Sequence, residues 1–186
     1  MKRKTQKKKR NKKRRFTRKD YKSKDGMLTS VWGPGLWHFL HVISFNYPIE
    51  PNEDQKQQYH DFMKQLEFIL PCRYCRENYK KNIRDVPLNK SVFRSRDTFS
   101  RYVYRLHEHI NAMLGKTSNL SFEDVRERYE HFRSRCDKEK EKKEAKQANE
   151  KGCIHPLKGN KPRCVLNIIS AQDEGNSIQI DPNLGF

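Results

Sequence analysis

Apolar side chains concentrate between residues 31 and 132, where they recur at steps of three and four. That spacing places them on one face of an α-helix, so the pattern predicts an all-α fold. The first predicted helix carries an apolar face from Trp37 to Phe45. It ends at Tyr47-Pro48, because proline cannot continue a helix.

The next two predicted helices flank a proline. A second helix opens after Pro51-Asn52 and runs to Pro71. A short basic third helix then runs from Cys72 to about Ile83. Because proline interrupts a helix, the second and third helices are expected to be separate elements.

The fourth and fifth predicted helices carry end signals. Asp97 or Thr98 is suited to cap the fourth helix, and Gly115 is the kind of residue that commonly ends one. Ser121 with Asp124 resembles a capping box, which starts the fifth helix. The pattern therefore predicts one compact helical domain over residues 28–136.

Positive charge is concentrated at the N-terminal end. Residues 1–24 hold 15 of the 41 Lys and Arg against one acid, Asp20, and so carry most of the net charge of +18. With few large apolar side chains, residues 1–27 are expected to form a basic disordered arm. Such an arm is typical of nucleic-acid binding, here through residues 1–24 only, or of nuclear entry.

The sequence shows no targeting or membrane segment of a familiar kind. The arm lacks the apolar centre of a secretory signal. No stretch approaches the roughly 20 apolar residues of a membrane span. At the other end, residues 137–186 are expected to be a charged linker and an irregular tail, with one strand-like piece from Val165 to Ile169.

Cys72 and Cys75 are the most informative chemical feature. Two thiols at this spacing serve a redox disulfide, half of a zinc site or, when His follows directly, haem attachment. Arg76 excludes the last of these. His38 and His41 would supply two further zinc ligands, but a gap of 30 residues fits no short zinc-finger loop. We expect no metal, and a zinc-stabilised interaction module stays an alternative.

The local sequence favours redox chemistry. Pro71 precedes the pair, so both thiols are predicted to lie in the first turn of the third helix. Unpaired amide N–H groups and the helix dipole at that end favour thiolate over thiol. Thiolates of low pKa are good leaving groups in disulfide exchange.

Four segments in this order resemble the Erv/augmenter-of-liver-regeneration family of sulfhydryl oxidases. They are Trp-Gly-Pro-Gly-Leu-Trp-His-Phe-Leu-His at 32–41, Leu-Pro-Cys-Arg-Tyr-Cys at 70–75, Leu-His-Glu-His-Ile-Asn at 106–111, and the segment 121–129. Together they cover about 100 residues. They look most like the versions found in large cytoplasmic DNA viruses.

The resemblance implies an FAD-dependent thiol oxidase on a four-helix bundle with a short fifth helix, usually a homodimer. Cys75 would be the flavin-proximal thiol and Cys72 the interchange thiol. Electrons would pass from a protein dithiol, such as a thioredoxin- or glutaredoxin-like carrier, through the cysteine pair to FAD and then to O₂, giving a disulfide and H₂O₂. If the chain is viral, host cytoplasm or virion is the expected location.

The resemblance also carries over a set of flavin contacts. The implied cofactor-binding residues are Gly33, Trp37, His41, Phe45, His107, Asn111, Lys116 and Tyr129. Tyr129 stands where the family usually has Trp, and Glu108 replaces the first Asn of the flavin motif. On spacing alone, the rings at 37, 41 and 45 fit an ordinary core equally well.

A second cysteine pair often shuttles electrons in this family. Cys153 and Cys164, beyond the charged linker, are the candidates here, which would leave Cys136 as the odd thiol. Equally open is that the tail cysteines have no such role or that one of them pairs with Cys136. A flexible tether would raise their effective concentration near Cys72. Beside the oxidase, a nucleic-acid-binding adaptor that acts through the basic arm stays open as an alternative function.

Overall fold

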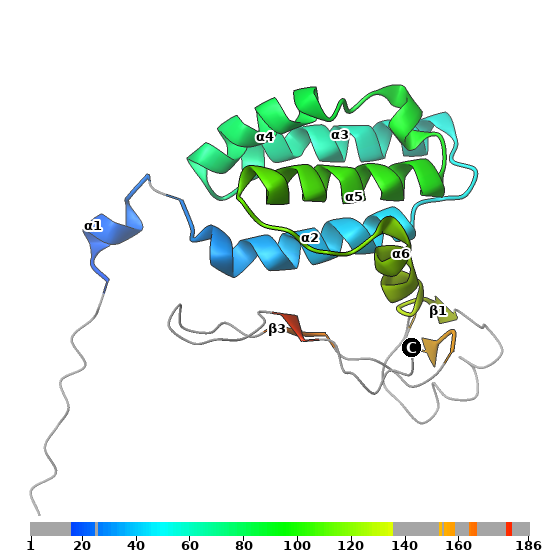
Figure 1. Ribbon diagram of the computed structural model, residues 1–186. Coiled ribbons are helices and arrows are strands. Elements are labelled where there is room, and N and C mark those ends of the chain that lie inside the picture. Colours follow the sequence, from blue (N-terminus) through cyan, green and yellow to red (C-terminus); the bar gives the residue numbers. More distant parts are fainter. Residues whose placement is uncertain are drawn as a thin grey trace, which may run out of the picture.

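The computed structural model describes residues 16–24, 26–135, 153, 155–158, 164–166 and 178–179. Its main body is a bundle of four helices, α2 (Thr29–Phe45), α3 (Glu53–Ile69), α4 (Arg73–Asp85) and α5 (Arg96–Met113). A shorter helix, α6 (Phe122–Glu130), packs against α2 and α5 at the side of the bundle (Figure 1). The expected all-α fold of four helices and a short fifth is confirmed.

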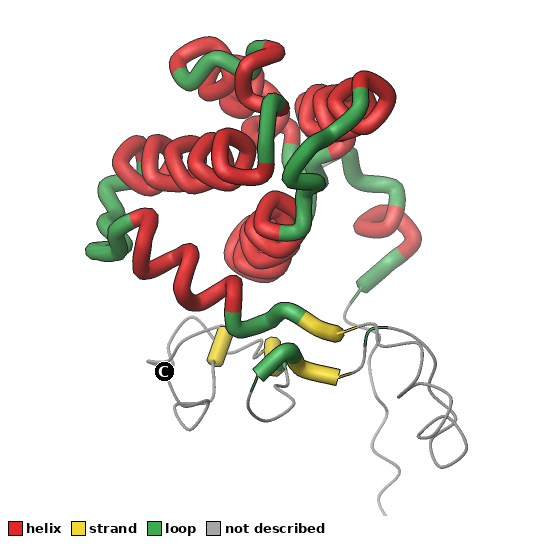
Figure 2. Tube along the Cα trace, turned by 90° about the vertical axis from the view of Figure 1, so that its right-hand side faces the viewer, coloured by secondary structure: helices red, strands yellow, loops and turns green. Residues whose placement is uncertain are grey.

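The remaining elements are short. They are α1 (Arg18–Tyr21), the 3-10 helix η1 (Lys90–Phe93), and the two-residue strands β1 (Ser134–Arg135), β2 (His155–Pro156), β3 (Val165–Leu166) and β4 (Ile178–Gln179). β1 pairs with β2 and β3 with β4, both antiparallel. Figure 2 shows the short loop, residues 131–133, that joins α6 to β1.

Three tyrosines lie in the bundle core, and each has a hydrogen-bond partner for its hydroxyl. Tyr47, Tyr79 and Tyr102 are buried. Their hydroxyls donate to the carbonyls of Phe93 (2.9 Å), Met63 (2.9 Å) and Val86 (3.1 Å). Because a buried hydroxyl without a partner is costly, these bonds allow large rings to fill the core. The contact to Met63 also joins α4 to α3.

Helix ends account for most differences from the predicted boundaries. The cap of α5 is Ser95, whose hydroxyl accepts from the Thr98 N–H at 3.3 Å, so the prediction of Asp97 or Thr98 was wrong. Thr98 instead occupies the third helical position and completes the capping box. Ser121 and Asp124 form the predicted box, and Gly115 has the left-handed φ of 67° that follows a helix end.

The two ends of the chain also differ from expectation. In the basic arm, Thr17 caps α1 through a capping box with Asp20, which is local order that the arm's composition did not predict. The fifth helix, α6, ends at Glu130, before the predicted charged linker begins. β3 falls on the first two residues of the predicted strand-like piece, and 167–169 lie outside the described residues. Of the described helices, none has the length and apolarity needed to cross a bilayer.

Candidate functional site

Cys72 and Cys75 lie at the start of α4, as predicted. Cys72 is the N-cap residue, and its Sγ accepts a hydrogen bond from the Cys75 backbone N–H at 3.3 Å. Both side chains are partly exposed free thiols. An N-cap sulfur in this position uses one of the unpaired amide groups of the first turn, which stabilises negative charge on it.

The two thiols have different acidities. Hydrogen bonding from the Cys75 side chain, together with backbone N–H groups of the first turn, holds the pKa of the Cys72 thiol below its usual value. Burial raises the pKa of the Cys75 thiol, and its contact with Cys72 adds to the rise. The expectation that both thiols favour thiolate is therefore correct for Cys72 and wrong for Cys75, which lies deeper.

A ridge on α2 connects the cysteine pair to the predicted flavin residues. Thr29, Gly33, Trp37, His41 and Phe45 follow one another at steps of four. The Thr29 hydroxyl lies 3.5 Å from Cys75 Sγ at one end of this ridge. At Gly33 an added Cβ would meet only Thr29 Cγ2, at 3.4 Å. The glycine therefore leaves a gap in the ridge between the sulfur and the rings.

The rings beyond that gap form one stacked cluster. Trp37 stacks on His107 of α5, with ring centroids 4.0 Å apart and planes within 7°. His41 and Phe45 both stack on Tyr129 of α6, at 5.1 and 5.5 Å. We call these five residues the ring cluster. It unites residues from three helices that are far apart in sequence, as the resemblance implied.

Two buried histidines in the ring cluster stay neutral. His41 Nε2 lies 3.0 Å from His107 Nδ1, close enough for a hydrogen bond. Burial, and after it the neighbouring His107, lowers the pKa of His41 to about 3. Burial likewise lowers the pKa of His107 to about 4. Both imidazoles are therefore uncharged at neutral pH.

His41 also carries an unused hydrogen-bonding atom. His41 is only 4% exposed, and its buried Nδ1 has no hydrogen-bond partner among the residues that the structure describes. A buried polar atom without a partner is costly unless something binds it. Together with the gap at Gly33 and the flat ring faces, this atom fits a planar heteroaromatic group such as the isoalloxazine of a flavin.

Of the other predicted site residues, Asn111 lies closest to the ring cluster along the sequence. It follows His107 by one turn of α5, and its side-chain amide donates to Glu108 at 3.0 Å. Glu108, which departs from the family motif, thus holds this amide. Lys116 is exposed beyond the end of α5, and no contact in the structure joins it to the ring cluster.

Sequence reasoning missed two residues that touch the site. Thr29 continues the steps of four backward from Gly33, and this periodicity was a usable signal. His38 was weighed only as a zinc ligand, yet its Nδ1 lies 3.2 Å from the Tyr129 hydroxyl. Burial raises the pKa of Tyr129 to about 12, so the phenol is neutral in this contact.

The tail cysteines are not paired as expected. Cys153 is disulfide-bonded, whereas Cys164 is an exposed free thiol. The two candidate shuttle cysteines are therefore not bonded to each other in the structure, and their role as a shuttle stays a prediction. Cys136 lies outside the described residues.

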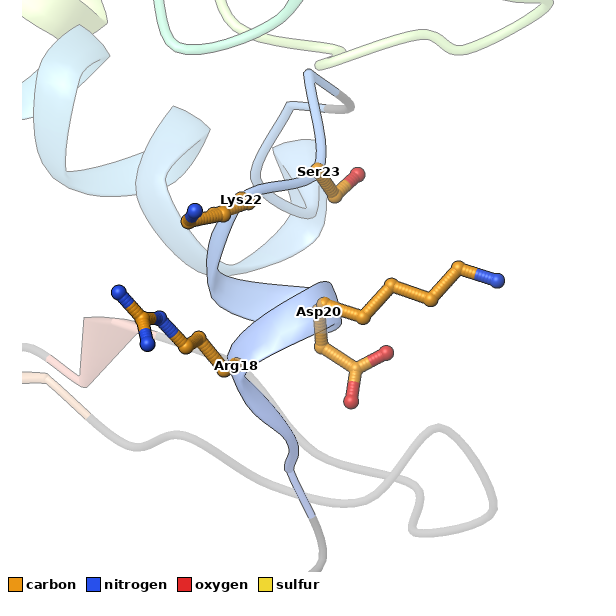
Figure 3. Close-up of a pocket in the computed structure, with 5 residues that line it drawn as sticks. Arg18, Asp20, Lys22 and Ser23 are labelled. Atoms are coloured by element: carbon orange, nitrogen blue, oxygen red, sulfur yellow. The ribbon is translucent and has the colours of Figure 1, made fainter.

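Other places for a ligand are less well built. Within the described part of the chain, no three His, Cys, Asp or Glu side chains gather as a metal site would require. A surface hollow of about 690 Å³ lies against α1 and is lined by Arg18, Lys19, Asp20, Lys22 and Ser23 (Figure 3). None of the predicted site residues lines it, so the cysteine pair and the ring cluster remain the candidate site.

Comparison with known proteins points to one family. The model of the Erv1 / Alr family matches residues 34–130. A probable FAD-linked sulfhydryl oxidase of Acanthamoeba polyphaga mimivirus is 34% identical over 90 residues, which cover 48% of this chain and 63% of that protein. A putative FAD-linked sulfhydryl oxidase of Invertebrate iridescent virus 6 is 32% identical over 46% of this chain and 81% of the relative.

Cellular relatives and solved structures agree with the viral ones. The FAD-linked sulfhydryl oxidase ERV1 of Arabidopsis thaliana is 32% identical over 45% of this chain, and the match spans 42% of that protein. The chain thus spans less than two thirds of the mimivirus and Arabidopsis relatives. The crystal structure of the FAD binding domain of Erv1 from Saccharomyces cerevisiae superposes with a TM-score of 0.50 and 25% identity, covering 55% of this chain and 94% of that one.

Proposed function

This chain belongs to the Erv1/Alr family, and we propose that it is an FAD-dependent thiol oxidase that forms disulfides in protein substrates. The proposal assigns the activity to the helical domain, residues 28–136. One observation carries it: the ridge on α2 runs from the Cys75 sulfur, past the gap at Gly33, to the stacked rings and the unpartnered Nδ1 of His41.

The cysteine pair performs the exchange with substrate. A substrate thiolate attacks Cys72 Sγ of the oxidised pair; a new S–S bond forms, the Cys72–Cys75 bond breaks, and the bonding electrons stay on Cys75. A second substrate thiolate then attacks the substrate sulfur of the mixed disulfide. The substrate leaves as a disulfide, and this electron pair stays on Cys72.

The unequal acidities suit these two steps. Burial raises the pKa of Cys75 and marks it as the enclosed sulfur, so the incoming thiolate meets Cys72. The lowered pKa of Cys72 then makes it a good leaving group when the substrate disulfide departs. Each cysteine is thus fitted to one role.

The remaining residues bind and orient the cofactor. When bound, FAD accepts the electron pair of the reduced cysteines and passes it to O₂, with H₂O₂ as product. Trp37 and His107 offer flat apolar faces for its ring system, and His41 Nδ1 is placed to pair with a polar ring atom. The absence of a side chain at Gly33 leaves space for the ring system. Asn111 and Lys116 are the remaining residues proposed to contact the cofactor.

A second copy of the chain is the expected partner of one exposed surface. Val31, Phe39 and Val42 lie on a face of α2 away from the ridge, and Phe39 is 50% exposed. Phe39 contacts Phe62 of α3 edge-on, with ring centroids 6.2 Å apart. An apolar surface across two helices is typical of an interface, and a homodimer would cover it.

Viral relatives bear on the setting of the reaction. Sulfhydryl oxidases of mimivirus, an iridovirus and African swine fever virus are among the proteins similar to this chain. The proposal therefore includes a viral origin, with thiol-bearing proteins of the host cytoplasm or the virion as substrates. Thioredoxin-like and glutaredoxin-like carriers are substrates of suitable chemistry.

Oxygen uptake with dithiothreitol tests the proposal. The purified protein should carry a visible flavin spectrum and consume oxygen, and Cys75→Ser and Cys72→Ser should each lower turnover at least about a hundredfold. Circular dichroism and retained flavin confirm that the variants are intact. A colourless wild-type protein, or a Cys75→Ser variant with full turnover, would refute it.

A further inference from the structure

A short segment ahead of α2 crosses the start of α4. Residues 26–28 form this N-terminal strap, in which the Met27 N–H donates to the Pro71 carbonyl at 2.7 Å. The indole N–H of Trp32 donates to the Met27 carbonyl at 3.1 Å. The strap is therefore fixed on one side to the residue before Cys72 and on the other to α2 itself.

Gly26 sets how closely the strap lies on the active-site turn. A Cβ at this position would stand 2.4 Å from the Pro71 oxygen and 2.7 Å from the Cys72 Cα. Both are backbone atoms and cannot move aside cheaply. Only glycine allows this close approach, so the strap and the cysteine turn are held in direct backbone contact.

The strap delivers the Thr29 hydroxyl to sulfur. Thr29 is the first residue of α2, and its Oγ1 lies 3.5 Å from Cys75 Sγ. The preceding N-cap residue, Leu28, makes no side-chain cap, so capping of the helix does not explain the position of this hydroxyl. A hydroxyl is a modest partner for a neutral thiol but a good donor to a thiolate.

We propose that Thr29 is a further catalytic residue, whose hydroxyl donates to Cys75 Sγ and stabilises the thiolate left there when the Cys72–Cys75 bond breaks. This inference rests on the proposed function for its role in turnover. In that step the substrate sulfur gains a bond to Cys72, and the electron pair of the broken bond stays on Cys75. The hydroxyl stabilises this charge and keeps its own proton.

The two nearest guanidinium groups contact other partners. That of Arg76 donates to the Leu70 carbonyl at 2.5 Å, and that of Arg73 donates to the Tyr74 hydroxyl at 3.2 Å and lies 4.0 Å from Glu77. Burial and Cys72 raise the pKa of Cys75, whereas the Thr29 hydroxyl lowers it. The same hydroxyl lowers the pKa of Cys72 to a lesser degree than the contacts with Cys75 do.

Alkylation of Cys75 across a pH series tests the assignment without any need for bound flavin. In the full-length Cys72→Ser protein, iodoacetamide labelling of the Cys75 peptide is followed by mass spectrometry. Thr29→Val, which keeps the shape and removes the hydroxyl, should raise the apparent pKa of Cys75 by about 0.5 to 1 unit and slow labelling at neutral pH about three- to tenfold. Thr29→Ser should restore the wild-type values.

A second variant controls for the shape of the new side chain. Thr29→Ala should give the same apparent pKa of Cys75 as Thr29→Val, which excludes a packing effect of valine at this exposed position. If the apparent pKa of Cys75 in all three variants equals its value in the protein that keeps Thr29, the assignment is wrong, even if the enzyme oxidises thiols. If the shift appears but the wild-type protein neither binds flavin nor consumes oxygen, the proposed function fails while the contact between Thr29 and Cys75 stands.

Discussion

At the scale of single residues, His41 links the architecture to cofactor binding. Its ring is buried between α2, α5 and α6, and one nitrogen faces His107 at 3.0 Å. The other nitrogen has no partner in the described part of the chain. A buried nitrogen without a partner destabilises the flavin-free protein, and it stabilises the complex if it bonds the flavin. Replacing His41 should therefore raise the stability of the flavin-free protein and lower its affinity for flavin.

Substitution of this histidine tests that argument. His41→Phe retains a flat ring and removes both the orphaned Nδ1 and the Nε2 that contacts His107. Because His107 is only half-buried, the gain from removing the orphaned atom exceeds the loss of that contact, and unfolding of the flavin-free protein should cost about 1 kcal/mol more. Flavin affinity should fall about tenfold, because the loaded site loses a hydrogen bond. Urea unfolding and a fluorescence titration with FAD measure the two quantities. Unchanged flavin affinity would show that Nδ1 does not meet the cofactor.

The buried histidines also predict how stability depends on pH. Their folded-state pKa values, about 3 for His41 and about 4 for His107, lie below the unfolded value of 6.5. The unfolded chain therefore takes up protons first as pH falls. Stability present above about pH 6.5 should decline by about 1.4 kcal/mol per pH unit for each histidine as the pH falls toward about 4.

Urea unfolding at a series of pH values measures this slope. In His41→Phe the slope between about pH 6.5 and pH 4 should fall by about 1.4 kcal/mol per pH unit, because one of the histidines whose pKa is lowered by burial is gone. A wild-type slope near zero would mean that neither imidazole is held neutral by burial.

At the scale of elements, α6 decides whether the ring cluster is complete. This helix of nine residues supplies Tyr129 and docks through Phe122 and Val125 beside Phe45. Such a short helix depends on its cap. The Ser121 hydroxyl accepts from the Asp124 N–H at 3.2 Å, and the Asp124 carboxylate accepts from the Ser121 N–H at 2.8 Å.

Removal of the cap should therefore weaken both the helix and the site. Ser121→Ala is expected to cost about 1 kcal/mol of unfolding free energy and to raise the dissociation constant of flavin. Thr117→Ala, an exposed substitution in the preceding loop, serves as the control. Equal denaturation midpoints for the two variants would contradict the capping role.

Local signals in the sequence predicted some of these elements and not others. Ser121 and Gly115 were identifiable because one capping box or one glycine punctuates an otherwise regular pattern. Ser95 was missed because Asp97 and Thr98 nearby are equally suited to capping. The 3-10 helix η1 was missed because its order comes from burial of Val92 and Phe93 against the bundle, which is a tertiary effect.

In the candidate site too, some residues were predictable from the sequence and others were not. The ridge residues Trp37, His41 and Phe45 follow from their spacing, and the match to family motifs supplied the partners on α5 and α6. The role of Thr29 depends on the backbone contact between Gly26 and Pro71, which are 45 positions apart. No local pattern encodes a contact of that kind, so the strap became apparent only in three dimensions.

At the scale of the whole molecule, one face of α2 contributes to the candidate site and the opposite face is proposed to contact a second copy. The ridge faces the cysteine pair and the ring cluster, while Val31, Phe39 and Val42 remain exposed. A dimer through this second face would leave the start of α4, and with it Cys72, accessible to substrates. In the proposed dimer, assembly and catalysis would use different faces of one helix.

Disruption of that face should yield monomers. Phe39→Glu places a charge where an apolar contact is expected, and light scattering should then report the mass of one chain instead of two. Ile49→Glu, at a side chain that is 68% exposed and outside both helices, should leave the dimer intact. A wild-type protein that is monomeric at high concentration would overturn the proposed interface.

The central claim is that the Cys72–Cys75 pair delivers electrons to a flavin bound beside it. Anaerobic addition of dithiothreitol to the purified protein, with flavin absorbance followed in time, tests this most directly. The account predicts rapid bleaching in the wild type and a rate at least about a hundredfold slower in Cys75→Ser that has retained its flavin. Bleaching of Cys75→Ser at the wild-type rate would contradict it.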